Sequence, residues 1–158
     1  MIGLSKPVLK TSLVAALSVA ASMALAEGAK DIVKARQGYY SLLGLEMGAL
    51  TSMVKGETPY DADAAKAHAA NLVALTTYSA GGLYAPGTSN ADLPGETRAM
   101  PVIWDNMAGL AEKGAAFKAA VAELDAVAGD GLDALKPAFG KVGGTCKSCH
   151  DDFRAKDF

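Results

Sequence analysis

The sequence predicts an all-α protein folded as an antiparallel up-down-up-down four-helix bundle. Apolar residues recur every three or four positions in four stretches, which is the spacing of amphipathic helices. Glycine and proline mark the breaks between the stretches, and no stretch has the strict alternation of a β-strand. The 158 residues, 51% of them hydrophobic, suffice for one domain with a real core. Because most connections are short, consecutive helices are expected to be antiparallel.

The first 26 residues have the features of a secretory signal peptide. Lys6 and Lys10 precede an apolar run over residues 13–25, and Ala24-Leu25-Ala26 matches the small-residue cleavage pattern. The run is too short to span a bilayer comfortably. We therefore expect residues 1–26 to be removed and residues 27–158 to form the mature domain in the periplasm, without membrane attachment. The net charge of −2 shows no basic excess, so no nucleic-acid partner is expected.

The first two helices are predicted around residues 32–54 and 63–79. Arg36 shares the apolar stripe of the first helix, and Gly56 and Pro59 end that helix. Asp61 or Asp63 is expected to cap the second helix. The two stripes comprise Ile32, Tyr39, Leu43, Met47, Leu50 and Val54, then His68, Leu72 and Leu75.

A loop rich in glycine and proline, residues 81–94, separates these helices from two more, predicted over residues 103–128 and 132–153. Pro137 is expected to kink the last helix or to shift its start. The stripes of this second pair comprise Ile103, Met107, Leu110, Gly114, Phe117, Val121, Leu124 and Ala128, then Leu132, Leu135, Phe139, Val142, Cys146, Cys149 and Phe153.

Chain direction alone predicts which residues meet at one end of such a bundle. This end holds the start of the first and third helices and the end of the second and fourth. The residues expected there are Arg36, Tyr40, Tyr78, residues 97–104 and residues 146–154.

The chemistry lies in Cys146-Lys147-Ser148-Cys149-His150, the C-x-x-C-H motif of covalent haem attachment. Two thiols on one helical turn can each add to a haem vinyl group, and the imidazole of His150 can then bind the iron. A redox dithiol and a structural zinc half-site are the alternatives. The first needs a βαβ context, and the second needs four ligands, whereas the chain has two cysteines and two histidines. We therefore predict one haem c on Cys146 and Cys149, with His150 as the proximal ligand.

The motif lies at the carboxyl end of the last of four helices, and this position resembles that in the class II c-type cytochromes, cytochrome c′ in particular. Similar segments occur along the whole mature chain: Ala35-Arg36-Gln37, Lys55-Gly56, Tyr60-Asp61-Ala62, Ala85-Pro86-Gly87-Thr88, Ile103-Trp104 and residues 143–154. The resemblance implies a four-helix bundle with haem at one end, nitric oxide or carbon monoxide as ligands, and a homodimer through the first two helices. Gly44, Gly48 and Ala49 would allow close helix contact, but they suit the bundle interior equally well.

The sixth iron ligand decides between gas binding and simple electron transfer. Low-spin members of the class carry a methionine one turn after the arginine of the first helix, and here that position is Tyr40. A phenol needs help to ionise, so Tyr40 is expected to shield the distal face without bonding to iron. Met47 and His68 are rival ligands, but both lie further from the haem end and are expected to pack in the bundle.

Haem propionates need partners, and Arg36 is at the right level to bind a carboxylate with two N–H groups. The resemblance implies that Arg36 and Gln37 touch the haem edge and that Thr97 and Arg98 do so too. Arg154 shares the helical face of His150, and Trp104 is expected to pack at the haem end.

Together these features predict a high-spin, five-coordinate haem protein that binds small gases and can take part in electron transfer with an unknown redox partner. The alternative is a low-spin electron carrier of the same bundle class with His and Met ligands. An enzyme is not expected, because peroxidase chemistry needs a distal acid-base pair and Leu43 and Gly44 beside Tyr40 supply none.

Overall fold

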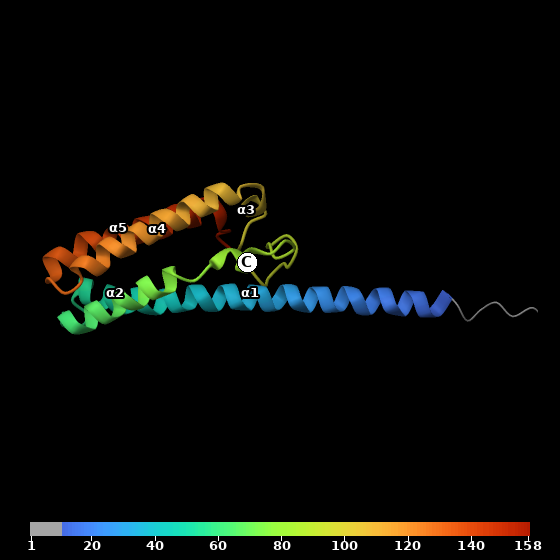
Figure 1. The fold of residues 1–158 in the computed structure, drawn as a ribbon, viewed down its shortest axis with the longest axis horizontal. Helices are drawn as coiled ribbons and strands as arrows, with labels where there is room; N and C mark the ends of the chain where they lie inside the picture. Colours follow the sequence, from blue (N-terminus) through green and yellow to red (C-terminus); the bar gives the residue numbers. More distant parts are fainter. Residues whose placement is uncertain (1–10) are drawn as a thin grey trace, which may run out of the picture.

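The computed structural model describes the backbone of residues 11–158 and the side chains of residues 27–158 (Figure 1). Residues 1–10 and the side chains of residues 11–26 lie outside this description, so the signal peptide stays a prediction. The helices are α1 (Thr11–Lys55), α2 (Ala62–Thr76), the 3-10 helix η1 (Ala80–Tyr84), α3 (Val102–Asp105), α4 (Met107–Val127) and α5 (Leu132–Phe153). Within residues 11–158 the only β-type pairing is a single bridge between Ala99 and Arg154.

The four long helices form the predicted up-down-up-down bundle (Figure 1). Contacts join α1 to α2, α2 to α4, α4 to α5 and α5 back to α1, which closes the ring. We call the end with Arg36, Tyr84, Thr97 and His150 the motif end, and the end with Leu124 and Leu135 the far end. The bundle fold and the set of residues gathered at the motif end are thus as predicted.

Local chemistry explains where the helices begin and end. Gly56, with φ of 75°, ends α1, because a left-handed conformation costs glycine little. The Asp61 carboxylate accepts a hydrogen bond from the Ala64 amide and caps α2. At the other turn of the far end, Gly131 adopts φ of 103° immediately before α5.

The third predicted helix is wrong in one respect, since the structure divides it at Asn106. This residue has φ of −136° and ψ of 53°, outside the helical region, and its side chain accepts a hydrogen bond from the Gly109 amide. Asn106 therefore caps α4, while Ile103 and Trp104 belong to the separate one-turn helix α3. Asparagine is a preferred capping residue, but the uninterrupted apolar stripe concealed its effect.

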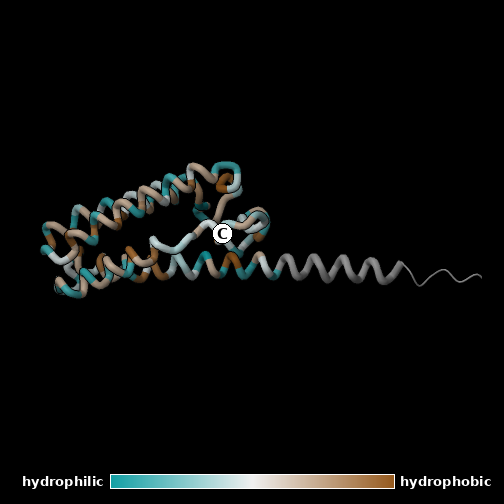
Figure 2. Tube along the Cα trace, viewed as in Figure 1, coloured by the Kyte–Doolittle hydropathy of each residue, from teal (hydrophilic) through white to brown (hydrophobic). Residues whose placement is uncertain are grey.

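The hydrophobic core fills the middle and the far end of the bundle. Figure 2 shows hydrophobic and hydrophilic residues mixed along each helix, as in amphipathic helices that bury one face. In α1 the buried residue near the motif end is Val33, at 2% exposure, and the predicted Ile32 is only half-buried. Gly114 of the predicted α4 stripe is exposed. The largest fully buried apolar side chains are those of Leu50, Leu72, Val121, Leu124, Leu135 and Val142.

Pro137 neither breaks α5 nor delays its start, because α5 runs from Leu132 through Pro137 to Phe153. The proline is exposed, so its ring faces solvent and not a neighbouring helix. No helix among the residues searched is long and apolar enough to cross a membrane.

Candidate functional site

The C-x-x-C-H motif occupies the last two turns of α5. Cys146 and Cys149 are both free and half-buried, and Cys146 packs against the hydrophobic core. Backbone hydrogen bonds hold this end of α5 to the segment before α3: the Met100 amide donates to the Phe153 carbonyl, and the Ala155 amide donates to the Arg98 carbonyl. Two backbone hydrogen bonds to residues 98–100 therefore fix the helix end that carries the motif.

The two thiols do not have the lowered pKa of a reactive dithiol. Burial is the main cause that raises the pKa of both Cys146 and Cys149, whereas reactive cysteines have a lowered pKa. The residues searched contain no group of three or more His, Cys, Asp or Glu side chains that could hold a metal ion. The dithiol and zinc alternatives thus gain no support from the local geometry.

His150 directly follows the second cysteine and has two arginines, Arg98 and Arg154, as neighbours. Burial, followed by the charge of Arg98, lowers the pKa of the imidazole. The Arg154 Nη1 lies 3.1 Å from Nδ1 of His150, one helical turn away. These neighbours favour the neutral imidazole, which is the form that binds metals.

Arg36 is 4% exposed and forms the centre of a hydrogen-bond network at the motif end. Its Nη1 donates to the Leu83 carbonyl at 2.9 Å and to the Thr88 hydroxyl at 3.0 Å. Its Nη2 donates to the Thr88 carbonyl at 2.7 Å and to the Thr97 hydroxyl at 3.0 Å. Four bonds occupy all four Nη hydrogens, so Arg36 clamps the long loop onto α1. The expected two-pronged grip on a propionate would have to replace some of these bonds, and the haem-edge role of Arg36 stays a prediction.

The other predicted haem-edge residues adjoin this clamp. Thr97 is buried and accepts from Arg36, while the Gln37 amide donates to the Glu96 carbonyl at 2.7 Å. Arg98 points toward the C-terminal tail: Nη1 donates to the Lys156 carbonyl at 3.1 Å, and the guanidinium lies 5.3 Å from the Phe158 ring centre. The structure thus brings all four residues to the motif end, and their contact with haem remains predicted.

Tyr40 forms a close pair with Tyr84 of η1. Their hydroxyl oxygens lie 2.6 Å apart and share a hydrogen bond in which either can be the donor. Burial, followed by the neighbouring Tyr84, raises the pKa of Tyr40 far above its ordinary value, and burial also raises the pKa of Tyr84. Burial therefore favours the neutral form of both phenols.

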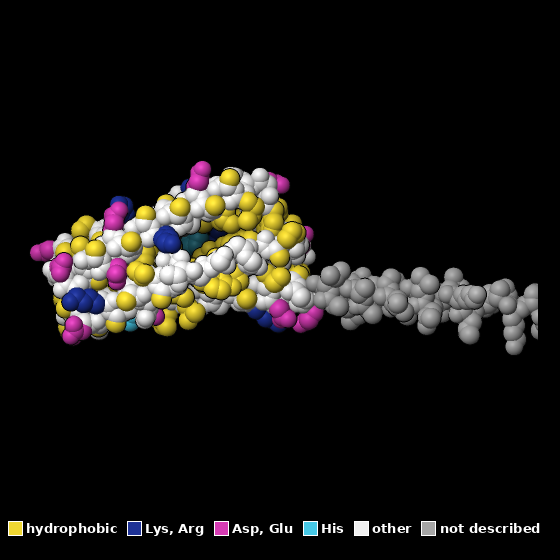
Figure 3. Space-filling view, in the orientation of Figure 1, with side chains coloured by type: hydrophobic (Ala, Val, Ile, Leu, Met, Phe, Trp, Pro, Cys, Tyr) yellow, Lys and Arg dark blue, Asp and Glu magenta, His cyan; other side chains and the backbone are white. Residues whose placement is uncertain are grey.

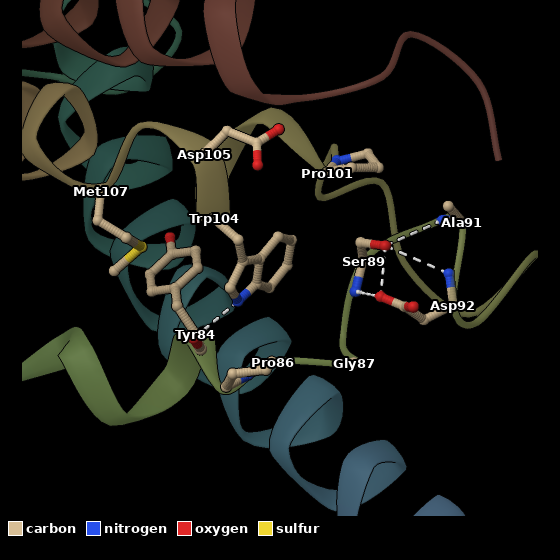
Figure 4. Close-up of a pocket in the computed structure, with 10 residues that line it drawn as sticks. All are labelled: Tyr84, Pro86, Gly87, Ser89, Ala91, Asp92, Pro101, Trp104, Asp105 and Met107. Carbon is tan, nitrogen blue, oxygen red and sulfur yellow. Dashed lines mark hydrogen bonds between the residues drawn. The ribbon is translucent and has the colours of Figure 1, made fainter.

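Tyr84 is held on two further sides. The Trp104 indole N–H donates to the Tyr84 carbonyl at 3.0 Å (Figure 4). The Arg36 guanidinium lies 5.4 Å from the centre of the Tyr84 ring. Tyr84 and Trp104 also line an open cavity of about 620 Å³ together with Met107 and the turn at Ser89 to Asp92. Figure 4 shows the two aromatic rings side by side in the wall of this cavity.

The rival ligands have other partners. Met47 is half-buried and packs against the core, and the Nδ1 atom of His68 lies 2.6 Å from a Glu46 carboxylate oxygen. The Tyr39 hydroxyl donates to the Leu75 carbonyl at 3.2 Å, so Tyr39 packs against α2.

The residues at the motif end fit a covalently attached haem. Two free thiols stand three residues apart on one helix and an imidazole follows at once. Large apolar side chains at this end are left partly uncovered, with Tyr40 at 42% and Met107 at 41% exposure. Figure 3 shows a hollow between α4 and the chain near η1, with hydrophobic side chains on its walls. A flat, apolar macrocycle is a suitable occupant of such a surface.

Two residues of this site, Tyr84 and Thr88, were not predicted to have a role. Both belong to the segment between α2 and α3, Tyr84 at the end of η1 and Thr88 in the loop after it, where no periodicity indicates which side chains point inward. The sequence signal for Tyr84 is an aromatic residue two positions after a glycine pair, in a segment at the expected haem end.

The comparisons with known proteins agree with this site. The family model described as Cytochrome C' matches residues 31–154. A cytochrome c′ from Cereibacter sphaeroides is 56% identical over 149 residues, which cover 94% of this chain and 97% of the relative. A solved cytochrome c′ structure from Rhodobacter sphaeroides is 58% identical with a TM-score of 0.79, and the match covers 81% of this chain and 98% of that one.

Solved variants of the cytochrome c′ from Alcaligenes xylosoxidans carry gases. One has carbon monoxide bound and is 37% identical, with a TM-score of 0.70 and coverage of 81% of this chain and 97% of that one. Another has nitric oxide bound. On the family model, the identities and the shared fold, this chain belongs to the cytochrome c′ family, whose members bind haem c.

Proposed function

We propose that this chain is a periplasmic, high-spin, five-coordinate cytochrome c′ that binds small gases such as nitric oxide or carbon monoxide and can also exchange electrons. The observation that carries the proposal is Tyr40, four residues after Arg36 and bonded to Tyr84. At this position the sequence offers a neutral phenol and no thioether sulfur. His150 is then the single protein ligand, and the opposite position is covered by an aromatic ring.

In this proposal each residue at the motif end has a separate task. Cys146 and Cys149 anchor the haem and His150 binds its iron from the α5 side. The haem supplies a one-electron couple and a coordination position for a diatomic gas. Tyr40 limits access from the α1 side, and Arg36 fixes the loop that carries Tyr84. A gas must therefore displace an aromatic side chain before it can bind, which favours small ligands.

The gas-bound relatives support the proposal, since carbon monoxide and nitric oxide are bound in the solved Alcaligenes proteins. The location is supported by the leader-like residues 1–26 and by the chemistry of haem c attachment, which takes place outside the cytoplasm. Mass spectrometry of the periplasmic fraction should find a chain that begins at Glu27 and carries one haem. A chain that retains residues 1–26 would contradict cleavage.

We also propose a homodimer through α1 and α2. Leu42 and Leu45 of α1 are 51% and 67% exposed. Gly44 and Gly48 are exposed and have open space where a side chain would stand, so they suit an outer contact better than the bundle interior. A 33% identical relative is described by its ligand-controlled dimer dissociation. Leu45→Glu should weaken self-association in sedimentation by about tenfold or more, because it buries an unpaired carboxylate. A monomeric wild type would contradict the dimer.

Carbon monoxide titration of two Tyr40 variants tests the central role of this residue. Tyr40→Ala should raise the affinity by about tenfold or more, because no ring has to move. Tyr40→Met should instead convert the haem toward a low-spin His/Met centre and lower gas affinity. Tyr78→Ala is the control, since Tyr78 is 55% exposed at the same end of the bundle. If neither Tyr40 variant changes gas binding or spin state, Tyr40 does not cover the iron and Met47 is the next residue to test.

A further inference from the structure

Among the side chains of residues 27–158, that of Tyr84 forms a hydrogen bond with the Tyr40 hydroxyl. The two hydroxyl oxygens are 2.6 Å apart, and the residues lie 44 positions apart in the sequence, on α1 and η1. A bond between separate elements restrains the movement of one relative to the other. Tyr40 is therefore positioned by more than its own packing.

The anchor itself is fixed from three directions. Trp104 donates to the Tyr84 carbonyl, Arg36 donates to the carbonyl of the preceding Leu83, and the Arg36 guanidinium faces the Tyr84 ring. Arg36 is buried and also donates hydrogen bonds to Thr88 and Thr97, so its own position is fixed and it restrains Tyr84. Tyr84 is therefore held in place by these contacts, and Tyr40 is the residue expected to move when the two hydroxyl groups separate.

We infer that Tyr84 is a positioning residue that latches Tyr40 over the distal side of the haem and thereby sets the affinity for diatomic gases. This inference rests on the proposed function, because it presupposes that Tyr40 covers the iron. A gas that displaces the Tyr40 ring breaks the hydroxyl pair, whereas the gas-free protein keeps it. Only such a difference between the two states can change affinity.

The size of the effect follows from the hydrogen bond. A neutral bond contributes a modest net free energy, which corresponds to about a 2- to 12-fold change in affinity. Tyr84→Phe keeps the ring beside Arg36 and Trp104 but removes the hydroxyl, so carbon monoxide affinity should rise by that factor. Tyr40→Phe removes the other half of the same bond and should produce a rise of similar size.

A double-mutant cycle separates the latch from two independent effects. The full-length haem protein is compared as wild type, Tyr40→Phe, Tyr84→Phe and the double variant, in carbon monoxide titrations of the ferrous form. The double variant should bind no more tightly than either single variant. Tyr39→Phe is the matched control: it removes a hydroxyl that bonds to the Leu75 carbonyl and leaves the latch intact, so its affinity should equal that of wild type.

Tyrosine ultraviolet resonance Raman spectra supply a readout independent of affinity. In wild type the hydrogen-bonded tyrosine signal should change when carbon monoxide is added, and in Tyr84→Phe this change should vanish. The inference would be wrong if either single variant bound carbon monoxide with wild-type affinity. It would also be wrong if the two increases in affinity multiplied in the double variant. A wild type that binds no carbon monoxide would instead contradict the proposed function and the latch with it.

Discussion

The two ends of the bundle are built on different principles. At the far end, Leu124 and Leu135 have no exposed surface and the core is wholly apolar. At the motif end, the buried groups include a guanidinium and the hydroxyls of Thr88 and Thr97, and several apolar side chains are partly exposed. The far end can be explained by hydrophobic packing alone, but the motif end cannot.

This difference concerns what stabilises each end of the bundle. Tight apolar packing stabilises the helices without needing any group beyond the chain. The motif end depends on directed hydrogen bonds that hold a long loop and on a covalent attachment that supplies apolar surface. Changes at the far end should therefore alter stability, and changes at the motif end should alter local order and ligand binding.

Loss of both thiols should have the largest effect. Cys146→Ala combined with Cys149→Ala removes the covalent attachment, so no haem should remain on the chain after denaturation. Hydrogen exchange should then accelerate in residues 83–104 and at the end of α5, while the far end keeps its protection. Cys146→Ala alone should retain haem through one thioether. Equal protection at both ends of the double variant would refute the division between them.

Leu124→Ala should lower the free energy of unfolding by about 2–5 kcal/mol, because it leaves a cavity in a fully buried core. The haem absorption spectrum of the folded protein should not change. Lys118→Ala, at an exposed position of α4, is the control, with an expected effect within about 0.5 kcal/mol. Urea unfolding followed by circular dichroism measures both, and a shifted spectrum in Leu124→Ala would show that the two ends are coupled.

Arg36→Lys keeps the positive charge but cannot reproduce four planar hydrogen bonds. We expect a loss of about 1.5–3 kcal/mol in the free energy of unfolding. Exchange should increase mainly in residues 83–97, which the guanidinium holds. Arg98→Lys is the comparison, because the Arg98 guanidinium donates one hydrogen bond, to the Lys156 carbonyl in the C-terminal tail. A smaller loss in Arg36→Lys than in Arg98→Lys would contradict the clamp.

The smallest predicted effect concerns Asp92 in the motif-end loop. Hydrogen bonds from the Ser89 hydroxyl and amide lower the pKa of its carboxyl. A lowered pKa in the folded state stabilises the protein above the ordinary carboxyl pKa of about 3.9, and this contribution is lost as pH falls through the folded-state value. The Tm of wild type should exceed that of Asp92→Ala at pH 7, and the difference should narrow below pH 4. A difference independent of pH would exclude the ionised carboxylate as its cause.

The regular parts of this molecule could be predicted from sequence and the loop could not. Periodicity identified the four long helices, and chain direction placed Arg36, Tyr40 and His150 at one end. The same periodicity extended the third helix through Asn106, because an apolar stripe carries no information on a single non-helical residue. It also chose Ile32 where Val33 is buried, an error of one position in the helix register.

In the candidate site, too, some residues could be predicted from sequence and others could not. The thiols and His150 follow from a contiguous motif, so their positions needed no tertiary information. Tyr84 and Thr88 contact Arg36 across 48 and 52 positions of sequence, through a loop without a repeating pattern. Arg36 was expected to face a propionate, and only the fold reveals that its Nη atoms are already bonded to this loop.

The absorption spectrum of the ferrous wild-type protein, before and after carbon monoxide, tests the central claim most directly. With His150 as the single protein ligand and Tyr40 unbonded to iron, the spectrum should have a high-spin Soret band without sharp α and β bands. Carbon monoxide should then convert it to a low-spin form. Sharp α and β bands before the gas is added, unchanged by it, would show that a second side chain binds the iron and would contradict the account.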